Sequence, residues 1–503
     1  MNRIDRDIVV IGAGASGLTA ATDLHSAGLS VAVLEARDRV GGRLLTDDIE
    51  GATLEVGGQW VSPDQHALKA TLRELGLRTY PRYREGESVY VGRDGVQRRF
   101  TGEVFPVSAE TEREVGRLTE LLDALTAQMD PDRPWAHPQA HELDRISFAR
   151  WLELQTDDVE ARDNVGLYLG AMMLTKPAHA FSALQALLMA ASAGSFSNLV
   201  DADFILDERV VGGLQQVPLL LAEGLGDAVH LEQPVRTVRW DEQGATVVTD
   251  DLEVTARQVV LAVPPPLISR IGFEPPLPRR QHQLHQHLSM GFVIKVHAVY
   301  ETPFWRADGL SATAFSPYEL VHEAYDNTNF GDERGTLVGF VSDESADGVF
   351  ELSAEERKQR ILTSMSHYYG ERTLSPVVYY ESDWGSEEWT RGAYAASFDL
   401  GGLARYGADL RAPVGPIRLS CSDVAGKGYQ HVDGAIRMGH ATAAAILEEE
   451  GVTEAAAAAR AAADADTDEA APAPSASSPA ASSPAPAVSS PAPAAPSPTL
   501  EHA

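Results

Sequence analysis

Residues 7–43 read DIVVIGAGASGLTAATDLHSAGLSVAVLEARDRVGGR, and this stretch decides the fold. An apolar run over 8–11 meets a glycine-rich turn, a segment with the composition of a helix follows, and a second apolar run over 31–34 ends at Glu35. The order strand, tight turn, helix, strand and acid is typical of a dinucleotide-binding βαβ unit. We therefore predict an α/β protein whose N-terminal part binds a dinucleotide.

The glycines of this turn have separate tasks. Gly12 permits the turn, Gly14 lets the backbone approach a pyrophosphate, and Gly17 lets the helix pack closely on the strand. The N–H groups at the start of the helix are free to hold phosphates, while Glu35 can accept hydrogen bonds from ribose hydroxyls and repels a 2′-phosphate. The contacts predicted here come from Gly12, Gly14, Ala15, Ser16, Gly17 and Glu35.

A second glycine pair and two further arginines follow the acid, in the sequence EARDRVGGR over 35–43. An enzyme that uses a nicotinamide dinucleotide needs no such extension. Arg37 and Arg43 could be solvated surface charges, but the loop follows a predicted sheet strand at its carboxyl end, where ligands bind. The extension resembles the second fingerprint of FAD-dependent amine oxidases, which implies FAD as the dinucleotide.

Composition restricts the classes of protein. The 503 residues suffice for two or three intertwined domains, and the formal net charge of -32 argues against a nucleic-acid partner. Because Cys421 is the one cysteine, no disulfide within the chain and no cysteine cage for a metal can form. The sequence shows neither a signal-peptide pattern nor an apolar run of about 20 residues. We expect a cytoplasmic protein without a membrane span.

Periodicity gives a coarse map of the remaining chain. Leucine-bearing patterns predict helices, and alternating β-branched runs predict strands. The predicted helices cover 111–129 and 181–194, and the predicted strands lie within 229–240, 245–250, 256–264 and 291–301. From 454 onward the chain is rich in Ala, Ser and Pro, a composition that cannot bury a core, so we expect a disordered tail over 454–503.

A run of histidines, QHQLHQH over 281–287, contains the one pattern that raises the question of a metal. His282, His285 and His287 lack support from cysteine and have the pattern of a solvated helix. We therefore expect no metal site.

Three distant segments resemble one family, the flavin monoamine and polyamine oxidases. They are the N-terminal fingerprint, the VGGL sequence at 211–214, and the C-terminal segment with Gly434 and Gly439. The resemblance covers roughly 5–450. Longer stretches, such as MLTKPAH, YDNTN, WTRGAYAASFDLGG and GYQHVDGA, are similar to the bacterial putrescine oxidases within this family.

The resemblance implies a monoamine oxidase-like architecture. A discontinuous Rossmann-like domain that binds FAD would comprise 1–80, 211–290 and 385–453, with an inserted α+β substrate domain over 81–210 and 291–384. It also implies a homodimer. Beyond the glycine turn and Glu35, the FAD contacts implied are Ala36, Arg37, Gly42, Arg43, Gly58, Gln59, Trp60, Val235, Asp423, His431 and Val432. Asp423 stands where the family usually has glutamate.

Four residues match positions that lie beside the flavin ring in the family. Tyr394 and His431 match the two cage residues, although relatives carry an aromatic residue at the second position. Lys295 matches the lysine that holds a water near the flavin, and Trp384 matches a tryptophan near the ring. The alternatives are a core tyrosine, a structural histidine and a strand-edge lysine that points to solvent. Ala393 occupies the place of the cysteine that bonds FAD in mammalian enzymes, which predicts noncovalent FAD.

A diamine requires a second anchor, because its distal ammonium stays charged and binds best to a carboxylate. The segment 319–326 alternates like a strand, so Glu323 and Tyr325 would share one face. The resemblance and this requirement together favour Glu323 as the anchor, with a solvated surface glutamate as the alternative. We expect the catalytic set to comprise Lys295, Tyr394, His431, Glu323 and Trp384.

The function implied is oxidation of putrescine by O2 to 4-aminobutanal, with release of ammonia and H2O2, and the aminoaldehyde can cyclise to 1-pyrroline. Another primary amine, a polyamine or an L-amino acid remains an alternative substrate. An amino acid oxidase should present an arginine to the substrate carboxylate, and none is identified in the predicted site. A flavin-binding protein without activity and a nicotinamide-linked dehydrogenase are the other two classes considered.

Overall fold

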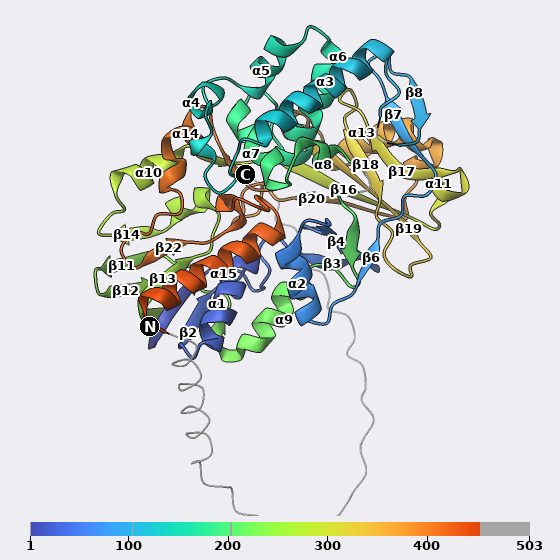
Figure 1. Cartoon of the computed structure of the whole chain (residues 1–503). Coiled ribbons are helices and arrows are strands. Elements are labelled where there is room, and N and C mark those ends of the chain that lie inside the picture. The colour runs from blue at the N-terminus through green and yellow to red at the C-terminus, as the bar shows by residue number, and fades with distance from the viewer. Residues whose placement is uncertain (1, 103, 202–203, 453–503) are drawn as a thin grey trace, which may run out of the picture.

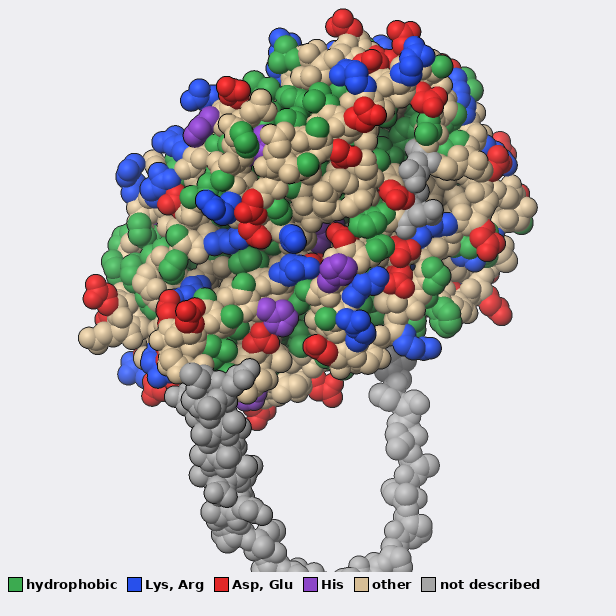
Figure 2. All heavy atoms as spheres, in the orientation of Figure 1, with side chains coloured by type: hydrophobic (Ala, Val, Ile, Leu, Met, Phe, Trp, Pro, Cys, Tyr) green, Lys and Arg blue, Asp and Glu red, His purple; other side chains and the backbone are tan. Residues whose placement is uncertain are grey.

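The computed structural model describes residues 2–102, 104–201 and 204–452. The tail predicted over 454–503 lies outside the described residues. Figure 1 shows two sheets with helices packed around them, one sheet in the lower left part and the other at the right. No described helix has the length and the apolar character that a membrane crossing requires. Figure 2 shows acidic and basic side chains interspersed over the visible face.

The N-terminal βαβ unit is confirmed. It consists of β1 (Asn2–Ile11), α1 (Ala15–Ser26) and β2 (Val31–Leu34), and β1 pairs with β2 in parallel. The apolar runs at 8–11 and 31–34 are fully buried, because helices cover this part of the sheet on one side and apolar residues within 235–277 cover it on the other. This burial explains why the runs are continuous rather than alternating.

Segments far apart in the chain build the first sheet, in the order β10-β2-β1-β13-β12-β11-β14, with β22 beside β13. α1 packs against α15 (Val432–Glu449) and α9 (Gln216–Leu225), as Figure 1 shows at the lower left. The predicted discontinuous Rossmann-like architecture is thus confirmed. The remaining strands are β10 (Val229–His230), β11 (Thr237–Asp241), β12 (Gly244–Val248), β13 (Leu252–Leu261), β14 (Gly272–Glu274) and β22 (Ile417–Leu419).

The second sheet has the order β20-β16-β19-β18-β17-β7-β8. One face packs on α13 (Ala354–Tyr369) and α12 (Asp343–Phe350), and the other face packs toward the helices around α7 (Ala183–Ser192). Its strands are β7 (Glu87–Val91), β8 (Gln97–Phe100), β16 (Val293–Tyr300), β17 (Leu310–Phe315), β18 (Glu323–Asp326), β19 (Gly335–Ser342) and β20 (Val378–Asp383).

The helices predicted over 111–129 and 181–194 are confirmed as α3 (Ala109–Thr126) and α7. They pack with further short helices at the top of Figure 1 and cover the second sheet's inner face. These neighbours are α5 (Phe148–Gln155), α6 (Val159–Leu167), η2 (Tyr168–Leu174) and α8 (Phe196–Val200). Short strands β5 (Trp60–Val61), β6 (Thr79–Pro81) and β9 (Glu208–Val210) form a small sheet near α2 (His66–Glu74).

The strand predicted over 319–326 is shorter in the structure. Only β18 at 323–326 is extended, and all four of its residues are buried because both faces of the second sheet are covered. The histidine run forms α10 (Arg279–Gln286), and among the described residues no group of three metal-binding side chains is placed to hold an ion. His287 instead contacts Asp399 through Nδ1 at 2.9 Å.

Candidate active site

One cavity joins the carboxyl ends of β1 and β2 to the inner face of the second sheet. Its walls include the glycine turn at one end and residues of β16, β18 and β19 at the other. Nearly all of the predicted site residues lie in these walls. Those that line it are Gly12, Gly14, Ala15, Ser16, Glu35, Ala36, Arg37, Gly42, Arg43, Gly58, Gln59, Trp60, Val235, Lys295, Glu323, Trp384, Tyr394, His431 and Val432.

The glycine turn has the shape that a pyrophosphate needs. Gly12 has a φ of +106°, and a Cβ there would lie 2.6 Å from the Ala262 carbonyl oxygen. A Cβ at Gly17 would lie 2.1 Å from the Gly12 carbonyl oxygen, so Gly17 acts in helix packing and does not line the cavity. Gly14 precedes α1, and no side chain caps the N–H groups of that helix. They are available to a phosphate.

Glu35 fixes the end of β2 against the glycine turn. Its Oε2 accepts the Ala13 N–H over 2.8 Å, and its Oε1 accepts the Arg37 N–H over 3.1 Å. Each carboxylate oxygen has two acceptor sites, so both can still accept a ribose hydroxyl. The carboxylate is 4% exposed in a cavity wall, which fits the predicted ribose contact.

Arg37 crosses to the segment that follows the second sheet. Its guanidinium pairs with Glu387 and donates to Thr390 Oγ1 over 2.5 Å. The side chain is 10% exposed, so the alternative of a solvated surface charge is wrong for this residue.

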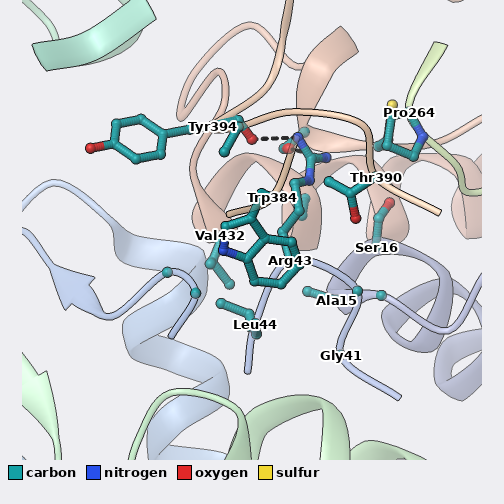
Figure 3. Close-up of a pocket in the computed structure, with 18 of the residues that line it drawn as sticks. Ala15, Ser16, Gly41, Arg43, Leu44, Pro264, Trp384, Thr390, Tyr394 and Val432 are labelled. Carbon is teal, nitrogen blue, oxygen red and sulfur yellow. Dashed lines mark hydrogen bonds between the residues drawn. The ribbon is translucent and has the colours of Figure 1, made fainter. Parts of the chain in front are cut away.

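Arg43 connects the dinucleotide turn with the predicted cage (Figure 3). One guanidinium nitrogen, Nη1, donates to the Tyr394 carbonyl over 2.9 Å. The other, Nη2, donates to Asp423 Oδ2 over 2.6 Å. Asp423 is 1% exposed and is not among the residues that line the cavity, so its contact with the cofactor stays a prediction. Both of its carboxylate oxygens accept from the Arg43 guanidinium.

Lys295 lies inside the protein, so the alternative of a solvent-facing lysine is wrong. Its Nζ donates to the Glu55 and Gly57 carbonyls over 2.6 and 2.9 Å and to Gln59 Oε1 over 2.6 Å. Burial lowers the pKa of Lys295 to about 7, against an opposing effect of Glu55. The Trp60 ring lies 5.6 Å from Nζ. A lysine with this pKa changes charge in the neutral range.

Tyr394 is held through its backbone. Thr175 Oγ1 donates to the Ala393 carbonyl over 2.6 Å and lies 3.2 Å from the Tyr394 amide nitrogen. The Tyr394 ring meets the Phe340 ring edge-on, with centroids 6.2 Å apart, and burial raises the pKa of its hydroxyl well above the usual value. Trp384 donates its indole N–H to the Val56 carbonyl over 3.2 Å.

His431 immediately precedes α15. Its Nδ1 lies 2.9 Å from the Tyr429 carbonyl oxygen, and because a carbonyl only accepts, Nδ1 carries the proton. In the neutral ring this leaves Nε2 as an acceptor. The residue lines the cavity together with Val432, the first residue of the helix.

Glu323 is a buried carboxylate in the same cavity, so the alternative of a solvated glutamate is wrong. It is 3% exposed, and its Oε2 accepts the Tyr325 hydroxyl over 2.6 Å. His322 Nε2 lies 3.5 Å from Oε1. A buried carboxylate requires a positive or hydrogen-bonding partner, and one oxygen retains room for such a group.

The model of the family described as flavin containing amine oxidoreductase matches residues 15–447. The chain belongs to this family. Putrescine oxidase of Kocuria rosea is 62% identical over 456 residues, which cover 88% of this chain and 95% of that protein. A solved structure of wild-type putrescine oxidase bound to putrescine has a TM-score of 0.88 and 66% identity, and covers 89% of this chain and 100% of that one. Cyclohexylamine oxidase from Brevibacterium oxydans has a TM-score of 0.85 at 30% identity, with coverage of 89% and 100%.

Membership of the flavin amine oxidoreductases makes the chain a flavin-dependent enzyme with FAD as its cofactor. The residues present fit that group. The uncapped start of α1 and the open side of Gly14 suit a pyrophosphate, and Glu35 suits a ribose. The cavity then continues to the buried Lys295 and Tyr394, where the redox ring of a dinucleotide would lie.

Several wall residues of this family member were not predicted. Trp389 lines the cavity, and the Arg270 guanidinium lies 4.0 Å from its ring centroid. Phe340 was not predicted because its strand carries no motif. The strand pattern of GTLVGFVS at 335–342 could have shown which residues share a sheet face with Phe340. Thr175, behind the wall, was also not predicted, because its contact with the Ala393 carbonyl joins residues 218 positions apart.

Proposed function

We propose that this chain oxidises putrescine with O2 and water to 4-aminobutanal, ammonia and H2O2, the aminoaldehyde then cyclising to 1-pyrroline. The observation that carries the proposal is the buried carboxylate of Glu323 in the same cavity as Lys295 and Tyr394. A carboxylate there matches the distal ammonium of a diamine. The similarity to putrescine oxidase of Kocuria rosea supports the same substrate.

The two ends of the diamine meet different surroundings. The reacting amine must lose its proton, since a protonated amine resists loss of hydride, and the apolar rings of Tyr394 and Phe340 favour the neutral form. The distal ammonium remains charged beside Glu323. When bound, FAD supplies the acceptor for the hydride equivalent from the carbon beside the reacting nitrogen. We propose that Lys295, Tyr394, His431 and Trp384 surround this end, and that Gln59 and Trp60 complete the wall.

An L-amino acid is a poorer candidate for the substrate. Among the described residues that line the cavity, the arginines are Arg37, Arg43 and Arg270. Each pairs with an acidic side chain, Arg37 with Glu387, Arg43 with Asp423 and Arg270 with Glu388. A carboxylate substrate would also meet the negative charge of Glu323.

A peroxide assay with putrescine, cadaverine, spermidine, tyramine and lysine tests the proposal. We expect putrescine to give the highest kcat/KM, and a higher value for lysine would overturn it. The variant Glu323→Gln tests the anchor, because it should raise KM for putrescine far more than for butylamine. Equal increases for the two amines would remove Glu323 from this role.

We also propose that the FAD-binding domain comprises 1–80, 211–290 and 385–453, with 81–210 and 291–384 as the substrate domain. In support, the first sheet is built from strands within 2–34, 229–274 and 417–419, and the second from strands within 87–100 and 293–383. We propose further that the enzyme is a cytoplasmic homodimer. Light scattering after size exclusion should give twice the chain mass, and the mass of one chain would contradict the dimer.

A further inference from the structure

A row of side chains crosses the second sheet from Lys295 on β16 to Phe315 on β17. Lys295 on β16 pairs directly with Phe340 on β19, which pairs directly with Glu323 on β18, which pairs with Phe315 on β17. Residues directly opposite in antiparallel strands share one face of a sheet. The lysine, the phenylalanine and the glutamate therefore stand side by side on the face that lines the cavity.

Phe340 separates the two polar residues of this row. It is 1% exposed, and its ring lies 6.2 Å from the Tyr394 ring and 5.9 Å from the Trp60 ring, centroid to centroid. Trp60 in turn lies near Lys295 and meets the Tyr325 ring at 5.6 Å. The hydrocarbon part of a diamine that reaches from the Tyr394 ring to Glu323 therefore runs along the Phe340 ring.

The position of Phe340 relative to the anchor is fixed by the sheet. Adjacent strands are about 4.8 Å apart, so Phe340 is held one such step from Glu323. The opposite face of these strands is packed against helices, with Ile294, Ala324 and Val341 each 0% exposed. Close packing prevents the strands from spreading.

The anchor is also fixed in position. The Tyr325 hydroxyl holds Glu323 Oε2 over 2.6 Å. Phe315 stands next in the row and lies in an aromatic cluster, with its ring 5.5 Å from Phe105 and 5.9 Å from Tyr325. Glu323 cannot move outward into space that these rings fill.

We propose that Phe340 determines the chain length of the diamine that this enzyme accepts. The inference rests on the proposed function, with Glu323 as the distal anchor. A diamine whose reacting end lies beside Tyr394 and whose distal ammonium meets Glu323 runs along the Phe340 ring, so this ring limits the room for a longer chain. A smaller side chain at 340 makes room for one more methylene and leaves the Glu323 carboxylate in place.

The test compares Phe340→Leu with the wild type as FAD-loaded enzymes, using kcat/KM for cadaverine and for putrescine. We expect the ratio of cadaverine to putrescine to rise about tenfold, the lower range of discrimination for one methylene in an apolar pocket. Phe340→Trp should lower the ratio. The matched control is Phe304→Leu, since Phe304 is 7% exposed and packs on the opposite face of the sheet, and its ratio should stay at the wild-type value.

The monoamines pentylamine and butylamine distinguish the proposal from simple enlargement of the pocket, because a monoamine has no distal ammonium for Glu323 to bind. In Phe340→Leu, the ratio of kcat/KM for pentylamine to that for butylamine should change much less than the ratio for cadaverine to putrescine. An unchanged diamine ratio, or equal changes in both ratios, would overturn the role of Phe340 and leave the proposed function intact. A wild type that releases no peroxide with any diamine would overturn the proposed function and this inference together.

Discussion

The Tyr325 hydroxyl donates a hydrogen bond of 2.6 Å to Oε2 of Glu323, two residues earlier on β18. Both side chains are buried, and burial together with the negative charge of Glu323 raises the pKa of Tyr325 well above its usual value. The tyrosine therefore stays protonated and always donates. We infer that it orients the carboxylate that receives the distal ammonium.

Removal of this hydroxyl should weaken binding of diamines selectively. We expect Tyr325→Phe to raise KM for putrescine about tenfold, which corresponds to the loss of one hydrogen bond to a charged group. KM for butylamine should change little, because butylamine has no second ammonium. The control is Tyr300→Phe, which removes a buried hydroxyl bonded to the Thr373 carbonyl over 2.8 Å. Equal effects of Tyr325→Phe on both amines would contradict the positioning role.

Lys295 should make the reaction with O2 depend on pH. Burial lowers its pKa to about 7, so the side chain is an ammonium below that pH and neutral above it. A positive charge stabilises the negative charge that develops on O2, so reoxidation of reduced FAD should slow as pH rises through about 7. Below pH 7 we expect reoxidation in Lys295→Met to be at least tenfold slower than in the wild type. Its rate should also be independent of pH between pH 6 and 9.

Stopped-flow absorbance of the anaerobically reduced enzyme, mixed with oxygenated buffer from pH 6 to 9, measures these rates. His297 lies two residues further on β16, but burial holds its pKa well below the usual value, so it stays neutral throughout. The charged groups acting on Lys295 are Glu55 and Arg209, which pair with each other over 2.6 Å. A pH dependence that persists in Lys295→Met would assign the titration to another group.

Asp423 should affect retention of FAD although it does not line the cavity. It holds the Arg43 guanidinium through Oδ2 over 2.6 Å and is the charged partner of Arg43, whose other acceptors are the Tyr394 carbonyl and Ser422 Oγ. We expect the Asp423→Asn enzyme to release FAD at least tenfold faster than the wild type. The release rate is measured as the rise in flavin fluorescence after the enzyme is diluted. Asp250→Asn provides the control, because Asp250 pairs with Arg236 on the exposed surface. An unchanged release rate in Asp423→Asn would show that Arg43 needs no such support.

The sequence was sufficient to predict the parts of the site that carry local motifs. The glycine turn, Glu35 and the arginines after it are encoded within 7–43, and Lys295 is conspicuous as a lysine in an apolar strand. Burial of Glu323 could be argued from chemistry, because the distal ammonium requires a carboxylate. These residues occupy the cavity walls in the structure.

The contacts that were not predicted depend on segments distant in sequence. Asp423 meets Arg43 across 380 positions, and Thr175 meets Ala393 across 218. The alternating pattern predicted a strand over 319–326, which is longer than β18. Both faces of β18 are buried, so the contrast between inward and outward residues does not mark where the strand begins. Phe340 acquires its place only from the register of β16, β19 and β18.

The enzyme should hold FAD without a covalent bond. Ala393 lines the cavity beside Tyr394 and offers only a methyl group, and Cys421 is the one thiol of the chain. Cys421 also lines the cavity, but it is 3% exposed and burial raises the pKa of its thiol well above the usual value, so the nucleophilic thiolate is not formed. After acid precipitation we expect all flavin absorbance in the supernatant, with the same result for Cys421→Ser. A yellow pellet from the wild type that turns colourless in Cys421→Ser would identify a bond to this sulfur, and a yellow pellet from both would place a bond elsewhere.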